Sequence, residues 1–324
     1  MTQERNVYMD FRSLLSIIAT LFLLLVAGYV ARKTGIINET ASKNLSKLIV
    51  QLGQPMLIIG SLLSVEFSHE NLKQGFLIIA LGFMAHIILS LLAYFFCLPI
   101  RNLDERKITE FSAIFANCGF IGFPIMKTIF GDIGLFWGAF FVISFHLMMW
   151  TWGIGIYTRK RPDIKLTPKK IILNFGTVPC IIGVCLYVSQ IIPGVVIPSF
   201  FISFLNYLGS LCTPISMLVT GALLATRTPK QIFGNKNIYY LCLLKLLVMP
   251  LFMLFFTKLI GLSYEMIMLL TVMAAMPSAA MVSMLSELYD IEPGYASQSV
   301  GMTSILSTAT LPCVMLFAQW ICTL

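Results

Sequence analysis

The 324-residue sequence contains few charged residues. Asp, Glu, Lys and Arg make up 11% of it and apolar residues 58%, whereas about a quarter of the residues of a soluble domain are charged. The chain therefore has too little polar surface to cover a water-soluble core of this size. We interpret the missing polar surface as lipid-facing surface, which predicts an all-α polytopic membrane protein.

Motifs of several other protein classes are absent. The sequence has no Walker A string, no HExxH and no GxSxG, which argues against an ATP-driven transporter acting alone and against an enzyme. The eight cysteines lie almost entirely in apolar runs without a CxxC pair, so we expect no metal site, no cofactor and no disulfide framework. The net charge of +8 comes without a nucleic-acid-binding motif, so no nucleic-acid partner is expected.

Ten apolar runs are long enough to cross a bilayer, which takes about 20 residues. The predicted spans are 11–31, 44–63, 73–98, 109–130, 134–157, 171–192, 200–225, 237–257, 264–286 and 296–322. Of the 22 Lys and Arg residues, 16 lie in or beside the odd-numbered connections, and five lie on the opposite side with the termini. This bias predicts a multi-pass protein of the cytoplasmic (plasma) membrane, with both termini outside.

The longest basic connection, 158–170, separates five predicted spans from the next five. An odd number of spans in each half places the halves in opposite orientations. We therefore predict a first five-helix repeat over 1–157, a cytoplasmic linker over 158–170, and an inverted five-helix repeat over 171–324.

Prolines interrupt corresponding spans of the two halves. Pro55 and Pro214 lie in the second and seventh spans, and Pro124 and Pro277 lie in the fourth and ninth. A helix break in lipid is tolerated only inside protein or beside a wet cavity. Two breaks in inverted halves would meet near the midplane, where half-helix N-termini attract anions. One kink alone can serve packing, but the paired breaks favour a binding site.

The predicted substrate site is centred on the strings FANCGFIGFPIM and MPSAAM. Its residues are Asn117, Cys118, Gly119, Gly122, Pro124, Pro277, Ser278, Ala279 and Met281. Asn117 would supply an amide donor and acceptor. Neither string contains Asp or Glu, which weakens coupling to sodium or protons through a buried carboxylate.

Polar residues of other spans could join this site. Lys245 either faces the crossover, where it would balance carbonyl ends or a substrate carboxylate, or extends to the headgroups. Gln54 either points into the substrate cavity or bonds to neighbouring helices. His86 and His146 are isolated within spans and lack metal-ligand spacing, so we interpret them as structural.

The same strings resemble the auxin efflux carrier family, including its bacterial branch of malate and malonate permeases, within the bile acid/arsenite/riboflavin transporter superfamily. The resemblance runs over nearly the whole chain, from GYVARKTGIINETASKNLSKLIVQLGQPMLI to MPSAAMVSMLSELYDIEPGYASQSVGMTSILSTATLPCVM. It implies two inverted five-helix repeats, with a scaffold part and a transport part whose broken fourth and ninth helices cross. It also implies that Asn117, Pro124 and Pro277 lie at the crossover, and it allows a homodimer.

The resemblance further implies substrates with a carboxylate and an elevator-like movement. Plant members have a polar residue soon after the ninth-helix proline, where this chain has the apolar residues Ala279, Ala280 and Met281, so a plant hormone is not predicted. We predict a secondary, non-ATP transporter of small organic anions such as mono- or dicarboxylates, with the anion and membrane lipid as partners. A passive anion channel and a sodium-coupled organic anion symporter are the alternatives.

Overall fold

The computed structural model describes residues 11–159, 174–226 and 234–323, and every regular element within these ranges is a helix. The predicted linker 158–170 lies outside the described residues from 160 onward. The helices before the linker are α1 (Phe11–Lys33), α2 (Glu39–Leu48), α3 (Gln54–Leu62), α4 (His69–Phe96), α5 (Leu103–Ile114), α6 (Phe123–Phe130), α7 (Asp132–Met148) and α8 (Ile154–Thr158). Those after it are α10 (Thr177–Ser189), α11 (Ser199–Ser210), α12 (Cys212–Leu224), α14 (Lys236–Leu243), α15 (Met249–Leu259), α16 (Tyr264–Ala275), α17 (Met281–Tyr289) and α18 (Pro293–Thr323).

Seven helical stretches of the described chain are long and apolar enough to cross a membrane. They are Leu15–Lys33, Glu39–Leu62, His69–Phe96, Asp132–Thr158, Ser199–Leu224, Lys236–Leu259 and Pro293–Thr323. The other three predicted spans coincide with shorter apolar helices, Cys118–Phe130, Thr177–Ser189 and Tyr264–Ala275. Large apolar side chains such as Leu23 on α1 and Phe95 on α4 are exposed, as expected of lipid-facing surfaces. The chain is a multi-pass membrane protein.

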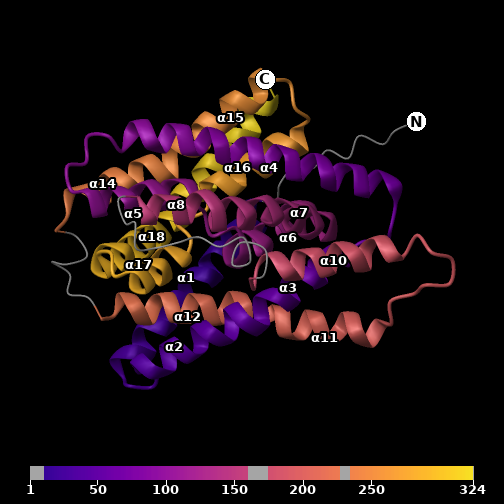
Figure 1. The fold of residues 1–324 in the computed structure, drawn as a ribbon, viewed down its shortest axis with the longest axis horizontal. Coiled ribbons are helices and arrows are strands. Elements are labelled where there is room, and N and C mark those ends of the chain that lie inside the picture. Colours follow the sequence, from indigo (N-terminus) through magenta and orange to yellow (C-terminus); the bar gives the residue numbers. More distant parts are fainter. Residues whose placement is uncertain (1–10, 160–173, 227–233, 324) are drawn as a thin grey trace.

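The helices pack as two groups (Figure 1). The α1 group consists of α1, α2, α3, α10, α11 and α12, and the α18 group of α4 to α8 and α14 to α18. Within each group the helices make most of their contacts with one another. The groups meet where α3 and α10 pack on α7, where α1 packs on α6 and α18, and where α12 packs on α18. In Figure 1, α2, α11 and α12 lie along one edge of the molecule and α4 along the opposite side.

Three of the interior prolines follow π-helical segments. These segments are η1 (Ile49–Gly53), η2 (Cys118–Gly122) and η4 (Leu244–Val248), and each is followed two residues later by a proline: Pro55, Pro124 and Pro250. A proline cannot donate a backbone hydrogen bond, and its ring clashes with the carbonyl one turn earlier. A wider π turn accommodates both effects, so these helices pass the proline without a full break. A fourth π-helical segment, η3 (Met149–Gly153), has no such proline.

Glycines bring α1 and α12 into backbone contact. A Cβ atom built on Gly221 would lie 1.9 Å from the Leu25 carbonyl oxygen, and one on Gly28 would lie 2.1 Å from the Leu218 carbonyl oxygen. Helices in lipid gain stability chiefly from such close packing of small residues. This contact makes α1 and α12 the core of the α1 group.

Gly221→Ala should therefore destabilise the protein. The added methyl group must push α1 and α12 apart, at a cost of about 1–3 kcal/mol. Gly155→Ala is the matched control, because a Cβ at Gly155 meets nothing within 4 Å and alanine is the better helix former. Thermal melting of the purified variants in detergent should show a lower melting temperature for the first only. Equal melting temperatures would show that the close approach of α1 and α12 is incorrect.

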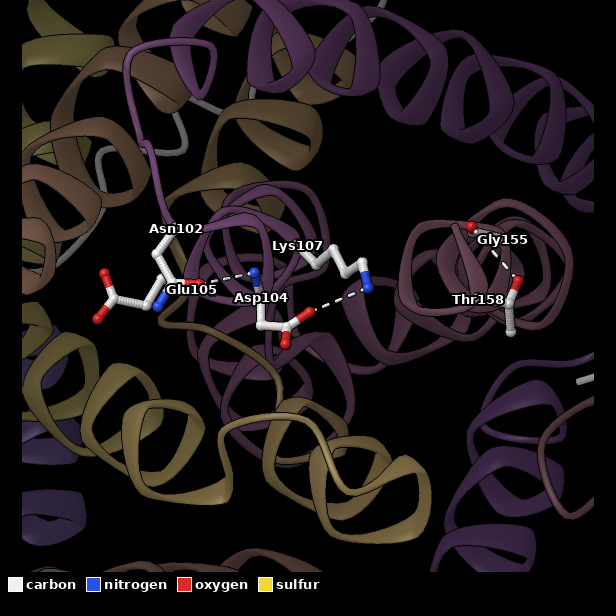
Figure 2. A network of polar contacts seen from close by, with 6 residues as sticks. All are labelled: Asn102, Asp104, Glu105, Lys107, Gly155 and Thr158. Carbon is white, nitrogen blue, oxygen red and sulfur yellow. Dashed lines mark hydrogen bonds and ion pairs between the residues drawn. The ribbon is translucent and has the colours of Figure 1, made fainter. Parts of the chain in front are cut away.

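Charged residues are paired along the buried helix α5. Asn102 caps its first turn through a hydrogen bond from the Asp104 N–H, and Lys107 Nζ lies 3.0 Å from Asp104 Oδ1 (Figure 2). Further along, Glu110 is fully buried and receives two hydrogen bonds from the Arg159 guanidinium, at 2.9 and 3.0 Å. Because these charges are paired, α5 can lie in the protein interior without an uncompensated buried charge. The helix ends there at Ile114.

Candidate functional site

Two helices of the α18 group stop inside the protein, and their ends meet. α5 ends at Ile114 and α16 at Ala275, and each continues after a short extended stretch, into η2–α6 and into α17 respectively. Ala116 and Ser278 form an isolated antiparallel bridge. Its hydrogen bonds run from Asn117 N to Pro277 O (2.7 Å) and from Ala279 N to Phe115 O (3.0 Å). The two interrupted helices therefore cross while running in opposite directions.

The carbonyl end of α5 is held by donors from the second half of the chain. In a continuous helix the Asn117 N–H would donate to Ala113 O, but here it donates to Pro277 O. Lys245 Nζ donates to Ala113 O instead (3.2 Å), and Ser278 Oγ donates to Ser112 O (3.2 Å). These substitutions satisfy buried acceptors that water cannot reach.

The N-terminal ends of the two continuing helices keep unpaired donors. Asn117 caps η2, because its Oδ1 atom accepts from the Phe120 N–H at 3.3 Å. No hydrogen bond from the N–H groups of Gly119, Ala280 or Met281 is present within the described chain, and these three residues are partly exposed. The Asn117 Nδ2 group also has no protein partner there. Unpaired N–H donors at helix N-termini, on residues that are themselves partly exposed, are suited to binding an anion.

The structure brings the predicted site residues together around this crossover. Cys118, Gly122, Pro277, Ser278 and Ala279 are buried in the joint, whereas Gly119, Pro124 and Met281 are partly exposed. Ser278 is fully engaged, since its N–H donates to Thr303 Oγ1 at 3.1 Å and its hydroxyl to Ser112 O. Through these bonds Ser278, which follows α16, links that helix to α18 and α5.

Lys245 faces the crossover. Its side chain is completely buried and its ammonium reaches the carbonyl end of α5. A lysine extending to the headgroups would have an exposed amine, so this alternative is not what the structure shows.

Gln54 faces the same region from the α1 group. It is partly buried, its Nε2 atom lies 3.3 Å from His146 Nε2, and a Cβ built on Gly119 would lie 3.9 Å from that amide. Gln54 thus bonds to a neighbouring helix, which is one of its two predicted roles, and it also lies beside η2.

Two residues at the crossover, Thr213 and Thr303, were not singled out by the sequence, and a third, His146, was interpreted as structural. Thr213 donates to Phe120 O at 2.9 Å, Thr303 accepts from Ser278, and His146 contacts Gln54. Thr213 directly precedes Pro214, which is the one local signal that could have marked it. His146 joins α7 to α3 across the two helix groups, a contact that is compatible with its predicted structural role. His86, in contrast, bonds to Gly82 O within its own helix at 2.7 Å.

Two interrupted helices that cross inside a multi-pass helical bundle are typical of membrane transporters. The chain belongs to the membrane transport protein family, whose model matches residues 13–315, and this confirms the resemblance to the auxin efflux carriers. An uncharacterized transporter of Methanocaldococcus jannaschii is 25% identical over 300 residues, covering 90% of this chain and 95% of the relative. A second uncharacterized transporter, from Methanothermobacter thermautotrophicus, is 23% identical over 300 residues, covering 91% and 95%. The protein is therefore a membrane transporter, and its family is one of transporters rather than enzymes.

Proposed function

We propose that this transporter is a secondary carrier of small organic anions, with the substrate carboxylate bound at the crossover. The observation that carries the proposal is the set of unpaired donors there: the amide of Asn117 and the N–H groups of Gly119, Ala280 and Met281. Each helix N-terminus adds about half a positive charge. A carboxylate accepts several hydrogen bonds and carries the opposite charge, so it complements this arrangement.

The proposal includes ten spans arranged as two inverted five-helix repeats. The antiparallel bridge between Ala116 and Ser278 supports this arrangement, because equivalent segments of inverted repeats run in opposite directions. The second and seventh spans also share a local irregularity just before a proline, the π turn η1 before Pro55 and the turn at Leu211 before Pro214, although neither helical stretch is fully broken there. We further propose the cytoplasmic membrane as its location, outward termini, and a homodimer surrounded by lipid.

Counterflow in proteoliposomes tests the proposed function. Vesicles loaded with unlabelled malate or malonate should accumulate the labelled acid transiently, because a carrier exchanges substrate across one alternating site. A passive channel would only equilibrate the label. Absence of transport with every mono- and dicarboxylate tried would overturn the proposal.

We further propose that alternating access occurs as the two helix groups slide past each other, which is the elevator-like movement that the family resemblance implies. Polar contacts between them include Gln54 with His146 and Thr213 with Phe120 O. Bonds of this kind must break and re-form as the α18 group moves.

Cross-linking the two groups should therefore stop transport. In a variant without its native cysteines, Gln54→Cys and His146→Cys would place two thiols between α3 and α7, and mercury-mediated linkage should abolish counterflow until a reducing thiol is added. Thr109→Cys with Tyr295→Cys is the control. The hydroxyl oxygens of these two residues lie 2.8 Å apart, and both residues belong to the α18 group. Transport that survives the first cross-link would rule out sliding at this interface.

A further inference from the structure

Lys245 is a completely buried amine with no acidic partner. Its exposure is 0%, and its Nζ atom bonds to Ala113 O. The ion pairs of the described chain, such as Lys107–Asp104 and Arg159–Glu110, do not involve Lys245. A buried ammonium costs several kcal/mol unless something compensates its charge. Its position in the protein interior therefore needs an electrostatic explanation.

The compensating charge is the carbonyl end of α5. Ala113 is the second-to-last residue of α5, whose C-terminus carries about half a negative charge. The regular helical donor to Ala113 O has been drawn away by Pro277 O, which leaves this acceptor open to Lys245. The helix end and the amine thus satisfy each other, one supplying the negative dipole and the other the cation.

The backbone around Lys245 explains how the amine arrives there. Lys245 lies in η4, the π-helical segment before Pro250, and η4 packs against α5, α16 and α18. A π turn shifts the helix face by one residue relative to a regular helix. The shift occurs at Lys245 itself, so the π turn η4 directs the Lys245 side chain toward the end of α5.

Carbonyl ends of broken helices are the places where transporters of related design hold coupling cations such as Na⁺. At this crossover the α5 end already has an ammonium group on it, attached covalently to the chain. We propose that Lys245, bonded to the end of α5 beside the anion site, is a built-in counter-cation that replaces a co-transported metal cation. The inference rests on the proposed function and separates it from the sodium-coupled alternative.

The first test needs no variant. Organic-anion counterflow by the wild-type protein should keep the same rate when sodium is replaced by N-methylglucamine on both sides of the vesicle. A rate that depends on sodium would overturn the inference. If wild-type protein moves no organic anion at all, the proposed function fails instead, and the melting experiment below still decides the role of Lys245.

The second test removes the amine and returns it as a small molecule. Lys245→Ala leaves the α5 end without its cation and opens a space of the shape of an alkyl amine. Propylammonium should raise the melting temperature of this variant and restore its counterflow, which we expect to be reduced roughly tenfold by the loss of a charged hydrogen bond. Tetramethylammonium, which has no N–H donor, should do neither.

Lys258→Ala is the matched control. Lys258 lies in the same span and also donates to a helix-end carbonyl, Ile321 O, but it is exposed. Propylammonium should leave the melting temperature of this variant and of the wild type unchanged. If propylammonium affects Lys245→Ala no more than the control, Lys245 is not a counter-cation and the inference is wrong.

Discussion

Replacing Asn117 with aspartate should preserve the fold and abolish anion transport. The aspartate carboxylate can still accept the hydrogen bond from the Phe120 N–H that Asn117 Oδ1 accepts at 3.3 Å, and a negative charge is favourable at a helix N-terminus. The same charge repels a substrate carboxylate, by about 4 kcal/mol at 4 Å and an effective dielectric of about 20. Counterflow should therefore fall by roughly a hundredfold or more, with an unchanged melting temperature.

Two further variants separate charge from capping. Asn117→Ala removes both the cap and the amide donor, so it should lower stability by about 1 kcal/mol and weaken anion binding without removing the protein from the membrane. Asn102→Asp makes the same chemical change as Asn117→Asp at the other end of α5, where Asn102 caps the Asp104 N–H at 3.0 Å. It should transport normally. Normal transport by Asn117→Asp would show that no anion binds beside this residue.

Replacing Arg159 with methionine should cause the largest loss of stability. Glu110 is fully buried and its two oxygens are held by Arg159 at 2.9 and 3.0 Å. Removing the guanidinium leaves an uncompensated buried carboxylate, which costs about 3–5 kcal/mol. We expect a lower melting temperature and a lower level of protein in the membrane.

The double variant Glu110→Gln with Arg159→Met should recover most of that loss, because it removes both charges together. Lys43→Met is the control, since Lys43 pairs with Glu39 at 2.8 Å on the exposed start of α2. Its effect should stay within about 1 kcal/mol. If the Arg159 variant melts like the Lys43 variant, the buried pair does not anchor α5.

Hydropathy and run length predicted seven of the ten proposed spans as helices long and apolar enough to cross a membrane, whereas the other three overlap shorter apolar helices. Lipid imposes a simple rule of length and hydropathy, which is why these helices could be found in the sequence. The interruption at Pro277 could also be predicted, because proline acts through local backbone chemistry. The interruption after α5 lies at residues 115–117 instead, whereas Pro124 lies inside the helical run η2–α6. The π-helical segments before Pro55 and Pro250 could not be predicted in this way, since they depend on how each helix accommodates a proline against its neighbours.

The contacts between distant segments were the least predictable part of the site. Ser278 was expected to bind substrate, yet its hydroxyl and N–H are engaged by Ser112 and Thr303. The place of Lys245 in its span allowed two positions for the amine, and only packing of η4 against α5 selects one. Such choices are made by tertiary contacts, which a single sequence does not display.

We propose that the paired N-termini of η2–α6 and α17 bind one carboxylate group. The most direct measurement compares malonate with malonamide, which has the same carbon skeleton without charge, by thermal shift and by competition with a labelled acid on purified protein. We expect malonate or another small carboxylate to stabilise the protein and compete, and its amide to do neither. Equal effects of an acid and its amide, across the carboxylates that bind, would contradict the claim.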